Sequence, residues 1–338
     1  MHSFDVRAAL RCATTFVLCG VISAVAAAED VPARKATFGN YDQCVEMRIG
    51  DAGVLLSPQA GGRVLQFWFL GSQSLYLDEQ ELQWRRGAKP AAITAGRFDY
   101  GPELVVKPHP RIWSGDWTAE IVGSFEVRMT SPRDEAAGMQ VVRTFTLAPT
   151  DGDPARTSAI LRCKQTLKNI GEAPQDVCHW GRSFSHGEGI VLIPLGAEPS
   201  RFPSKYAMYE DSAVINVRNV DPLIREREGF LEILGAPRKP KLGFDSYAGR
   251  LGYLMPGDLL LIKRFATDAN RVYNEAAGLT LSVWYPQGPR VELEPIGPRE
   301  RLAAGAEASF TEEWQLAKFP FPKSGEQVDL EAVRKLLK

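Results

Sequence analysis

The chain has no large excess of positive or negative charge, few histidines and few cysteines. Each of these shortages argues against a class of binding partner or site. It carries 40 Lys and Arg against 41 Asp and Glu, and its net charge is −1. Nucleic-acid binding and binding to an anionic membrane both need a concentrated basic surface, so neither partner is expected. The four histidines show no metal-ligand spacing and no Cys-x-x-Cys pair occurs, so no metal site is expected either.

Long apolar runs are missing except at the N-terminus, where the sequence is typical of a signal peptide. Arg7 and Arg11 precede an uncharged stretch, which ends in the small-residue cleavage site Ala26-Ala27-Ala28. We therefore expect residues 1–28 to be removed on export, leaving a periplasmic or secreted protein without a membrane span. A retained signal anchor is the alternative, because the stretch is at the short limit for a span.

Three cysteines follow the expected cleavage site: Cys44, Cys163 and Cys178. The last two flank residues 169–174, Asn-Ile-Gly-Glu-Ala-Pro, which have the composition of a hairpin turn. Export permits disulfides, so a cross-strand bridge between Cys163 and Cys178 is one interpretation. Buried free thiols are the other.

Alternation of apolar and polar residues with period two recurs along the chain and predicts β-strands. In one such segment Phe125, Val127 and Met129 alternate with polar residues. Similar segments, separated by Gly- or Pro-containing turns, lie at residues 64–69, 161–168, 279–285 and 310–316.

Helical spacing is convincing only near the C-terminus, at Leu330, Val333 and Leu336. Many short strands without intervening helices indicate an all-β fold, a large antiparallel β-sandwich with a short C-terminal helix. We expect a single domain over residues 29–338, with a tail that leaves the sheet from about residue 318.

The run Arg290-Val291-Glu292-Leu293-Glu294-Pro295 is the most informative part of the sequence. On a strand, Val291 and Leu293 would share one face, and Glu292 and Glu294 the other. Carboxylates are costly to bury unless they are paired or used. This strand is therefore predicted to present both glutamates to a functional cleft, although a structural salt bridge is the alternative.

Three motifs resemble the galactose mutarotase-like (aldose 1-epimerase-like) superfamily, and in particular its exported members of unassigned function. They are the Gly-rich strand entry Ala60-Gly61-Gly62-Arg63-Val64, the sequence Thr166-Leu167-Lys168-Asn169 followed ten residues later by His179, and Leu293-Glu294-Pro295. The resemblance runs in order over most of residues 61–314 and implies the galactose mutarotase-like supersandwich fold.

The resemblance also implies catalytic roles. His179 would protonate the ring oxygen of an aldose, and Glu294 would remove the proton of its anomeric hydroxyl. These steps are proton transfers, so no cofactor is implied. One departure matters: the family continues with a His-x-Tyr-Phe-Asn-like sequence, whereas this chain has His179-Trp180-Gly181-Arg182.

Substrate-binding residues are expected from the same resemblance and from the chemistry of their side chains. Arg97 and His109 would orient sugar hydroxyls, and Trp113 and Trp117 would stack on the apolar face of a sugar. The further candidates are Trp180, Arg182, Glu292 and Asp245.

We therefore expect an exported protein that binds a mono- or oligosaccharide and acts as an aldose epimerase through His179 and Glu294. The alternatives are a non-catalytic carbohydrate-binding module and a structural envelope protein with an exposed apolar patch. Nothing in the sequence sets the oligomeric state. All of these hypotheses depend on whether His179, Arg97, His109 and Glu294 converge in one cleft.

Overall fold

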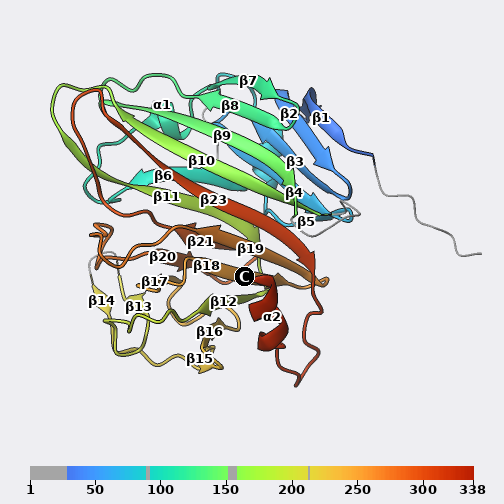
Figure 1. Cartoon of the computed structure of the whole chain (residues 1–338), viewed down its shortest axis with the longest axis vertical. Helices are drawn as coiled ribbons and strands as arrows, with labels where there is room; N and C mark the ends of the chain where they lie inside the picture. Colours follow the sequence, from blue (N-terminus) through green and yellow to red (C-terminus); the bar gives the residue numbers. More distant parts are fainter. Residues whose placement is uncertain (1–28, 89–91, 151–157, 212–213) are drawn as a thin grey trace, which may run out of the picture.

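Two large antiparallel β-sheets face each other in this computed structural model, which describes residues 29–88, 92–150, 158–211 and 214–338 (Figure 1). The expected signal peptide, residues 1–28, lies outside the described residues. The all-β sandwich predicted from period-two patterning is confirmed.

The first sheet has thirteen strands within the described residues. Along its main path these are β1 (Val31–Phe38), β2 (Tyr41–Ile49), β3 (Ala52–Ser57), β4 (Arg63–Phe69), β6 (Gly96–Gly101), β11 (Gln175–His186), β21 (Arg290–Pro295), β20 (Leu281–Trp284), β17 (Lys241–Phe244), β13 (Ala207–Tyr209) and β14 (Ile215–Asn216). Two short strands lie off this path, β5 (Ser72–Gln73) beside β4 and β22 (Glu300–Leu302) beside β11.

The second sheet has ten strands within the same described part of the chain. In spatial order they are β15 (Ile224–Arg227), β16 (Phe230–Ile233), β12 (Ile190–Pro194), β18 (Arg250–Met255), β19 (Leu259–Phe265), β23 (Glu307–Lys318), β10 (Ala159–Asn169), β9 (Met139–Pro149), β8 (Glu126–Thr130) and β7 (Thr118–Gly123). The three longest strands of this sheet, β23, β10 and β9, lie next to one another (Figure 1).

Three short helical segments complete the described chain: η1 (Glu79–Gln83), α1 (Pro110–Trp113) and α2 (Leu330–Leu336). The expected C-terminal helix is α2, which lies near β12 and β16 of the second sheet (Figure 1). Its Leu330 and Val333 pack with apolar residues of that sheet, among them Leu192. The Asp329 side chain caps its first turn by accepting from the amide of Ala332 at 3.0 Å. No helix among the described residues is long and apolar enough to cross a membrane.

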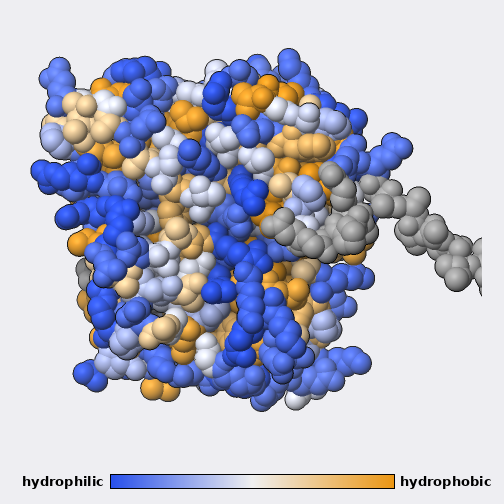
Figure 2. All heavy atoms as spheres, viewed as in Figure 1, coloured by the Kyte–Doolittle hydropathy of each residue, from blue (hydrophilic) through white to orange (hydrophobic). Residues whose placement is uncertain are grey.

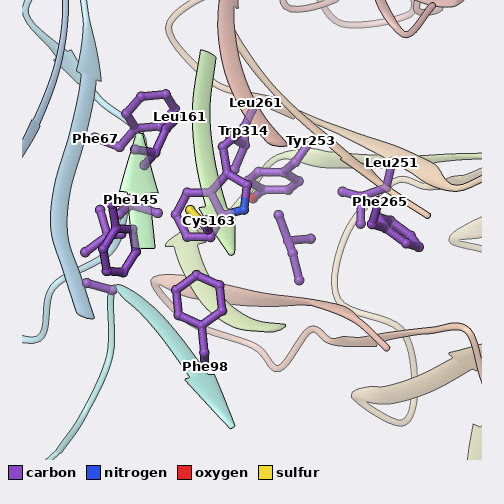
Figure 3. Packing of buried hydrophobic residues seen from close by; sticks show 14 of the residues in the cluster. Phe67, Phe98, Phe145, Leu161, Cys163, Leu251, Tyr253, Leu261, Phe265 and Trp314 are labelled. Carbon is purple, nitrogen blue, oxygen red and sulfur yellow. The ribbon is translucent and has the colours of Figure 1, made fainter. Parts of the chain in front are cut away.

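Apolar side chains from both sheets meet in one continuous core. Leu161 and Trp314 of the second sheet pack with Phe67 and Phe98 of the first (Figure 3). On the face of the molecule seen in Figure 2, hydrophobic residues are scattered in small groups among hydrophilic ones. Burial of this apolar surface between the sheets is the main stabilising term of the fold.

The expected hairpin between Cys163 and Cys178 is not formed. Their strands are consecutive in sequence, but β10 belongs to the second sheet and β11 to the first. Cys163 packs in the core between the sheets, whereas Cys178 packs with Trp180 on the other side of β11. The described cysteines Cys44, Cys163 and Cys178 are free and buried, so the disulfide interpretation is not supported.

One ion pair lies inside the apolar core. Lys263 of β19 and Glu312 of β23 are almost completely buried, and Nζ lies 3.0 Å from Oε2. Trp314 donates its indole N–H to the same Oε2 at 2.9 Å, and Lys263 donates to the carbonyl of Leu293 at 3.3 Å. Because Leu293 belongs to β21, this pair connects the second sheet to the strand that carries Glu292 and Glu294.

We predict that Lys263→Met lowers the free energy of unfolding by about 3–5 kcal/mol, because Glu312 is left as an uncompensated buried charge. Urea denaturation measures the loss. The matched control is Arg162→Met: Arg162 pairs with Glu313 at 2.8 Å, and both side chains are partly exposed. That substitution should cost less than about 1 kcal/mol. Equal losses from the two substitutions would contradict the assignment of Lys263 and Glu312 as a buried pair.

Candidate functional site

A cleft of about 1160 Å³ lies over the outer face of the first sheet, on the side away from the core. The floor of the cleft is a row of side chains from adjacent strands, because directly opposite residues of antiparallel strands point to the same face of the sheet. Glu292 of β21 stands between Phe184 of β11 and Trp284 of β20, and Lys241 of β17 stands beside Trp284. All four side chains line the cleft.

The predicted strand around Glu294 is β21, and its faces divide as expected. Val291 and Leu293 are fully buried in the core between the sheets, while Glu292 and Glu294 contact groups of the outer face. Neither carboxylate is open to solvent, however: their exposed fractions are 2% and 0%. Both glutamates are instead held by cationic side chains from other strands of the same sheet.

Glu292 is clamped by two arginines. Arg97 Nη2 donates to its Oε1 at 2.7 Å, and Arg182 Nε donates to the same oxygen at 3.1 Å. Arg97 and Arg182 are direct cross-strand neighbours on β6 and β11. Burial alone would raise the pKa of Glu292, but the two guanidinium groups outweigh it and lower that pKa to about 2. Glu292 is therefore an anion that holds both arginines at the cleft.

Glu294 lies beneath the cleft floor. Lys241 Nζ contacts both of its carboxylate oxygens at 2.7 Å, and Trp180 donates its indole N–H to Oε2 at 2.9 Å. Burial raises the pKa of Glu294 against the opposing effect of Lys241. The indole of Trp180 is itself 2% exposed, so Lys241 and Trp180 together cover the carboxylate.

His109 reaches the same group of charges from the loop before α1. Its Nε2 lies 2.7 Å from Asp99 Oδ1, and Asp99 Oδ2 lies 3.5 Å from Arg182 Nη1. Burial lowers the pKa of His109, but the hydrogen bond to Asp99 outweighs it, so this pKa is raised overall. Arg97, His109, Arg182 and Glu292 thus belong to one connected network of ion pairs and hydrogen bonds through Asp99.

Trp113 and Trp117 have different environments. The ring of Trp113 lies over both clamp arginines, with centroid distances of 4.4 Å to the Arg97 guanidinium and 5.6 Å to that of Arg182. Trp117 is 2% exposed and packs against the buried guanidinium of Arg143, so it is a core residue and not a sugar platform. This corrects the expectation for Trp117.

His179 does not meet Glu294. It alternates with Trp180 on β11 and points into the space between the sheets, where its ring stacks on Phe310 and its Nε2 lies 3.1 Å from the carbonyl of Ala308. Its exposed fraction is 1%, and burial lowers its pKa to about 4. His179 is therefore a neutral core histidine, and the expected convergence with Glu294 does not occur.

Asp245 also lies outside the cleft. Its carboxylate is buried and accepts hydrogen bonds from the hydroxyl of Ser200 at 2.6 Å and the amide of Arg201 at 2.7 Å. These bonds hold the loop that precedes β13 against the end of β17. The structure thus gives Asp245 a role in loop positioning, which corrects its assignment to the substrate site.

Glu275 is the main cleft residue that the sequence did not single out as a site residue. It lies in the loop between β19 and β20, and its Oε2 accepts the amide of Glu103 at 2.9 Å. Burial raises the pKa of Glu275 to about 7, and the negative charges of Glu103 and Glu294 add to this effect. Only the fold brings this loop to β21, so no local pattern could have identified it.

Two aromatic residues of the cleft were also missed, although the strand pattern contained a signal for them. Trp284 has the same alternation phase as Thr280 and Ser282, opposite to the buried Leu281 and Val283. Phe184 has the same phase as Trp180 on β11. The rings of Phe184 and Trp284 meet edge to face, with 6.2 Å between their centroids, in the floor of the cleft.

No group of three or more His, Cys, Asp and Glu side chains suited to a metal ion occurs within residues 29–338 as far as they are described. The cations Arg97, Arg182 and Lys241 instead pair with the carboxylates of Glu292 and Glu294, and Arg97 Nε is a buried donor without a hydrogen-bond partner. The arrangement can donate and accept hydrogen bonds, present aromatic faces and exchange a proton at Glu275.

Comparison with protein-family models and with curated sequences finds no match. Solved structures do match in fold. A protein of Synechocystis sp. PCC 6803 is 15% identical with a TM-score of 0.53, over 84% of this chain and 99% of that chain. A galactose mutarotase-like protein from Clostridium acetobutylicum is 8% identical with a TM-score of 0.53, over 86% and 99%. Another from Lactobacillus casei ATCC 334 is 12% identical with a TM-score of 0.52, over 81% and 100%.

The chain thus has the galactose mutarotase-like fold, and the resemblance seen in the sequence is confirmed at the level of fold. At these identities the likeness says nothing about individual residues, so the roles of the cleft residues rest on their own geometry.

We predict that Glu275→Gln makes stability less dependent on pH. The folded-state pKa of Glu275 lies above its ordinary value, so its protonation stabilises the fold at low pH. This contribution is lost as pH rises from about 4.5 through about 7. The glutamine variant cannot lose a proton, and should exceed the wild type by about 3 kcal/mol at pH 8 but not at pH 4. Urea denaturation at the two pH values checks this.

The matched control for that measurement is Glu120→Gln, because Glu120 is exposed and pairs with the exposed Arg128. Its effect on stability should be small and nearly the same at both pH values. A Glu275→Gln variant that is destabilised equally at pH 4 and pH 8 would show that this carboxyl is not protonated in the folded protein.

Proposed function

We propose that the chain binds a carbohydrate in the cleft over β11, β20 and β21. The observation that carries this proposal is the row of Phe184, Glu292, Trp284 and Lys241 across four strands, with Arg97 and Arg182 beside it. A sugar has hydroxyl groups that both donate and accept, together with apolar C–H faces. The cleft offers guanidinium and ammonium donors, carboxylate acceptors and aromatic faces.

Binding without turnover is better supported than the epimerase mechanism expected from the sequence. A general acid must reach its substrate, and His179 is enclosed between the sheets. A general base must be free to accept a proton, and both oxygens of Glu294 are held by Lys241. Sugar recognition needs neither group to change its protonation state.

One observation favours catalysis as a second candidate function. Glu275 lines the cleft, and its pKa of about 7 is in the range that suits a general acid at neutral pH. Measuring the anomerisation of aldoses by NMR, with wild type and Glu275→Gln, separates the two candidates. A rate above background that Glu275→Gln abolishes would establish catalysis, and the absence of any such rate would leave binding alone.

We predict that the protein binds members of a panel of mono- and oligosaccharides in isothermal titration calorimetry. Trp284→Ala and Arg182→Ala should each weaken binding about tenfold or more, because one removes an aromatic face and the other a charged donor. The control is Arg128→Ala, an arginine of the second sheet whose side chain is half exposed. That variant should bind as the wild type does.

His179 supplies a further comparison in the same titrations. His179→Gln should retain sugar affinity once its folding has been verified, because residue 179 points away from the cleft. Loss of binding in a folded His179→Gln variant, with binding unaffected in Trp284→Ala, would place the sugar site elsewhere and overturn the proposal.

We propose further that the protein acts outside the cytoplasm, on the basis of the signal-peptide pattern in residues 1–28. The expected outcome is a mature protein that begins at Glu29 and is found in the periplasm or the medium. Cell fractionation and N-terminal mass spectrometry measure both properties. A protein that keeps its first 28 residues in the membrane fraction would instead indicate the signal anchor.

A further inference from the structure

Two large apolar side chains stand exposed at the rim of the cleft. Leu104 and Val105 follow β6 directly, and 86% and 74% of their surface is exposed. Both line the cleft, together with Ile215 and Ala276 from two other segments. Isolated exposed apolar residues are common, but several that line one cleft indicate contact with an apolar group.

The backbone of the rim holds these side chains in place. The amides of Val105 and Val106 both donate to the carbonyl of Pro102 at 3.0 Å, which closes a turn. The amide of Glu103 donates to the Glu275 carboxylate at 2.9 Å and so fastens the turn to the loop between β19 and β20. Leu104 and Val105 thus lie in a hydrogen-bonded turn, which directs both side chains outward.

The floor of the cleft is charged but internally neutralised. Four cations face four carboxylates there. Glu292 is held by Arg97 and Arg182, and Arg182 also pairs with Asp99 at 3.5 Å. Lys241 holds Glu294, and Arg290 holds Asp78 at 3.3 Å. An anionic ligand would have to compete with these carboxylates for the same cations. A neutral polyhydroxylated group can instead add hydrogen bonds without breaking an ion pair.

The cleft is also large for a single sugar unit. Its volume of about 1160 Å³ exceeds the range of roughly 300–1,000 Å³ that is usual for sites of drug-sized ligands. A monosaccharide on Glu292 and Trp284 would therefore leave the rim at Leu104 and Val105 unfilled.

We propose that the ligand is a neutral saccharide that carries an apolar substituent, such as an alkyl or acyl chain or an apolar aglycone. The saccharide occupies the charged floor around Arg182 and Glu292, and the apolar substituent packs on Leu104 and Val105 at the rim. This inference rests on the proposed carbohydrate binding and adds the chemical class of the ligand.

Calorimetric titration with paired glycosides tests the inference. The probes are the methyl and octyl β-glycosides of glucose, galactose and mannose, with the octyl compounds kept below the concentration at which they form micelles. The octyl glycoside of the preferred sugar should bind at least about tenfold more tightly than its methyl glycoside, because the chain buries apolar surface on the rim.

Variants show whether the rim causes the difference. The double substitution Leu104→Ser and Val105→Ser should remove the advantage of the octyl glycoside and leave affinity for the methyl glycoside unchanged. Both residues are exposed, so the fold should tolerate the change. The control is Val220→Ser, at an apolar residue that is 88% exposed and does not line the cleft. It should keep the full advantage.

The outcomes distinguish the two proposals. If neither these glycosides nor any sugar of the panel of mono- and oligosaccharides binds, the proposed carbohydrate function fails together with this inference. Binding of a panel sugar without binding of any glycoside overturns this inference alone. Equal affinity for methyl and octyl glycosides leaves carbohydrate binding intact and overturns the inference alone. An octyl advantage that survives the double substitution also overturns it, because the chain then binds elsewhere. Self-association that the double substitution abolishes, without any octyl advantage, would assign the rim to a protein contact instead.

Discussion

The structure around the cleft depends on neutralising two carboxylates that β21 presents on one face. Glu292 and Glu294 are almost completely buried, and a buried carboxylate without a partner is strongly destabilising. The cations that hold them come from three other strands, with Arg97 on β6, Arg182 on β11 and Lys241 on β17. Each of these contacts requires the correct register, because a shift by one residue would turn the cation toward the core. The ion pairs of Glu292 and Glu294 and the backbone pairing of the strands therefore require the same strand register.

The sequence predicted the class of fold and the division of faces on β21, because both depend on local alternation. It could not set the phase of β11, where buried residues occur on both faces. Gly181 settles that phase: a Cβ atom there would lie 1.8 Å from Oε1 of the core residue Glu312. The odd-numbered residues around Gly181 consequently face the core. His179 is among them, whereas Trp180 and Arg182 face the cleft.

The rest of the prediction was limited because it depended on where the fold places segments that are far apart in the sequence. The turn after Asn169 has the composition of a hairpin, but it carries the chain from one sheet to the other, and no local signal distinguishes these cases. Glu275 is similar, since its altered pKa arises from burial and from carboxylates contributed by distant segments, Glu103 and Glu294. The division of faces on a regular strand such as β21 was thus found by pattern, whereas the environment of a loop residue such as Glu275 became known only in the folded chain.

Residues between Cys178 and Ser183 hold the carboxylates of β21 and also line or support the cleft. Trp180 uses its indole N–H to hold Glu294, Arg182 uses its guanidinium to hold Glu292, and Gly181 leaves room for Glu312 on the opposite face. Each of these three residues therefore has a structural role that does not depend on acid–base chemistry. For Glu294 to act as a base, its contacts with Lys241 and Trp180 would first have to be given up in a buried site, at a considerable energetic cost. A ligand that only adds hydrogen bonds to the intact network avoids that cost, which is why the geometry favours recognition over turnover.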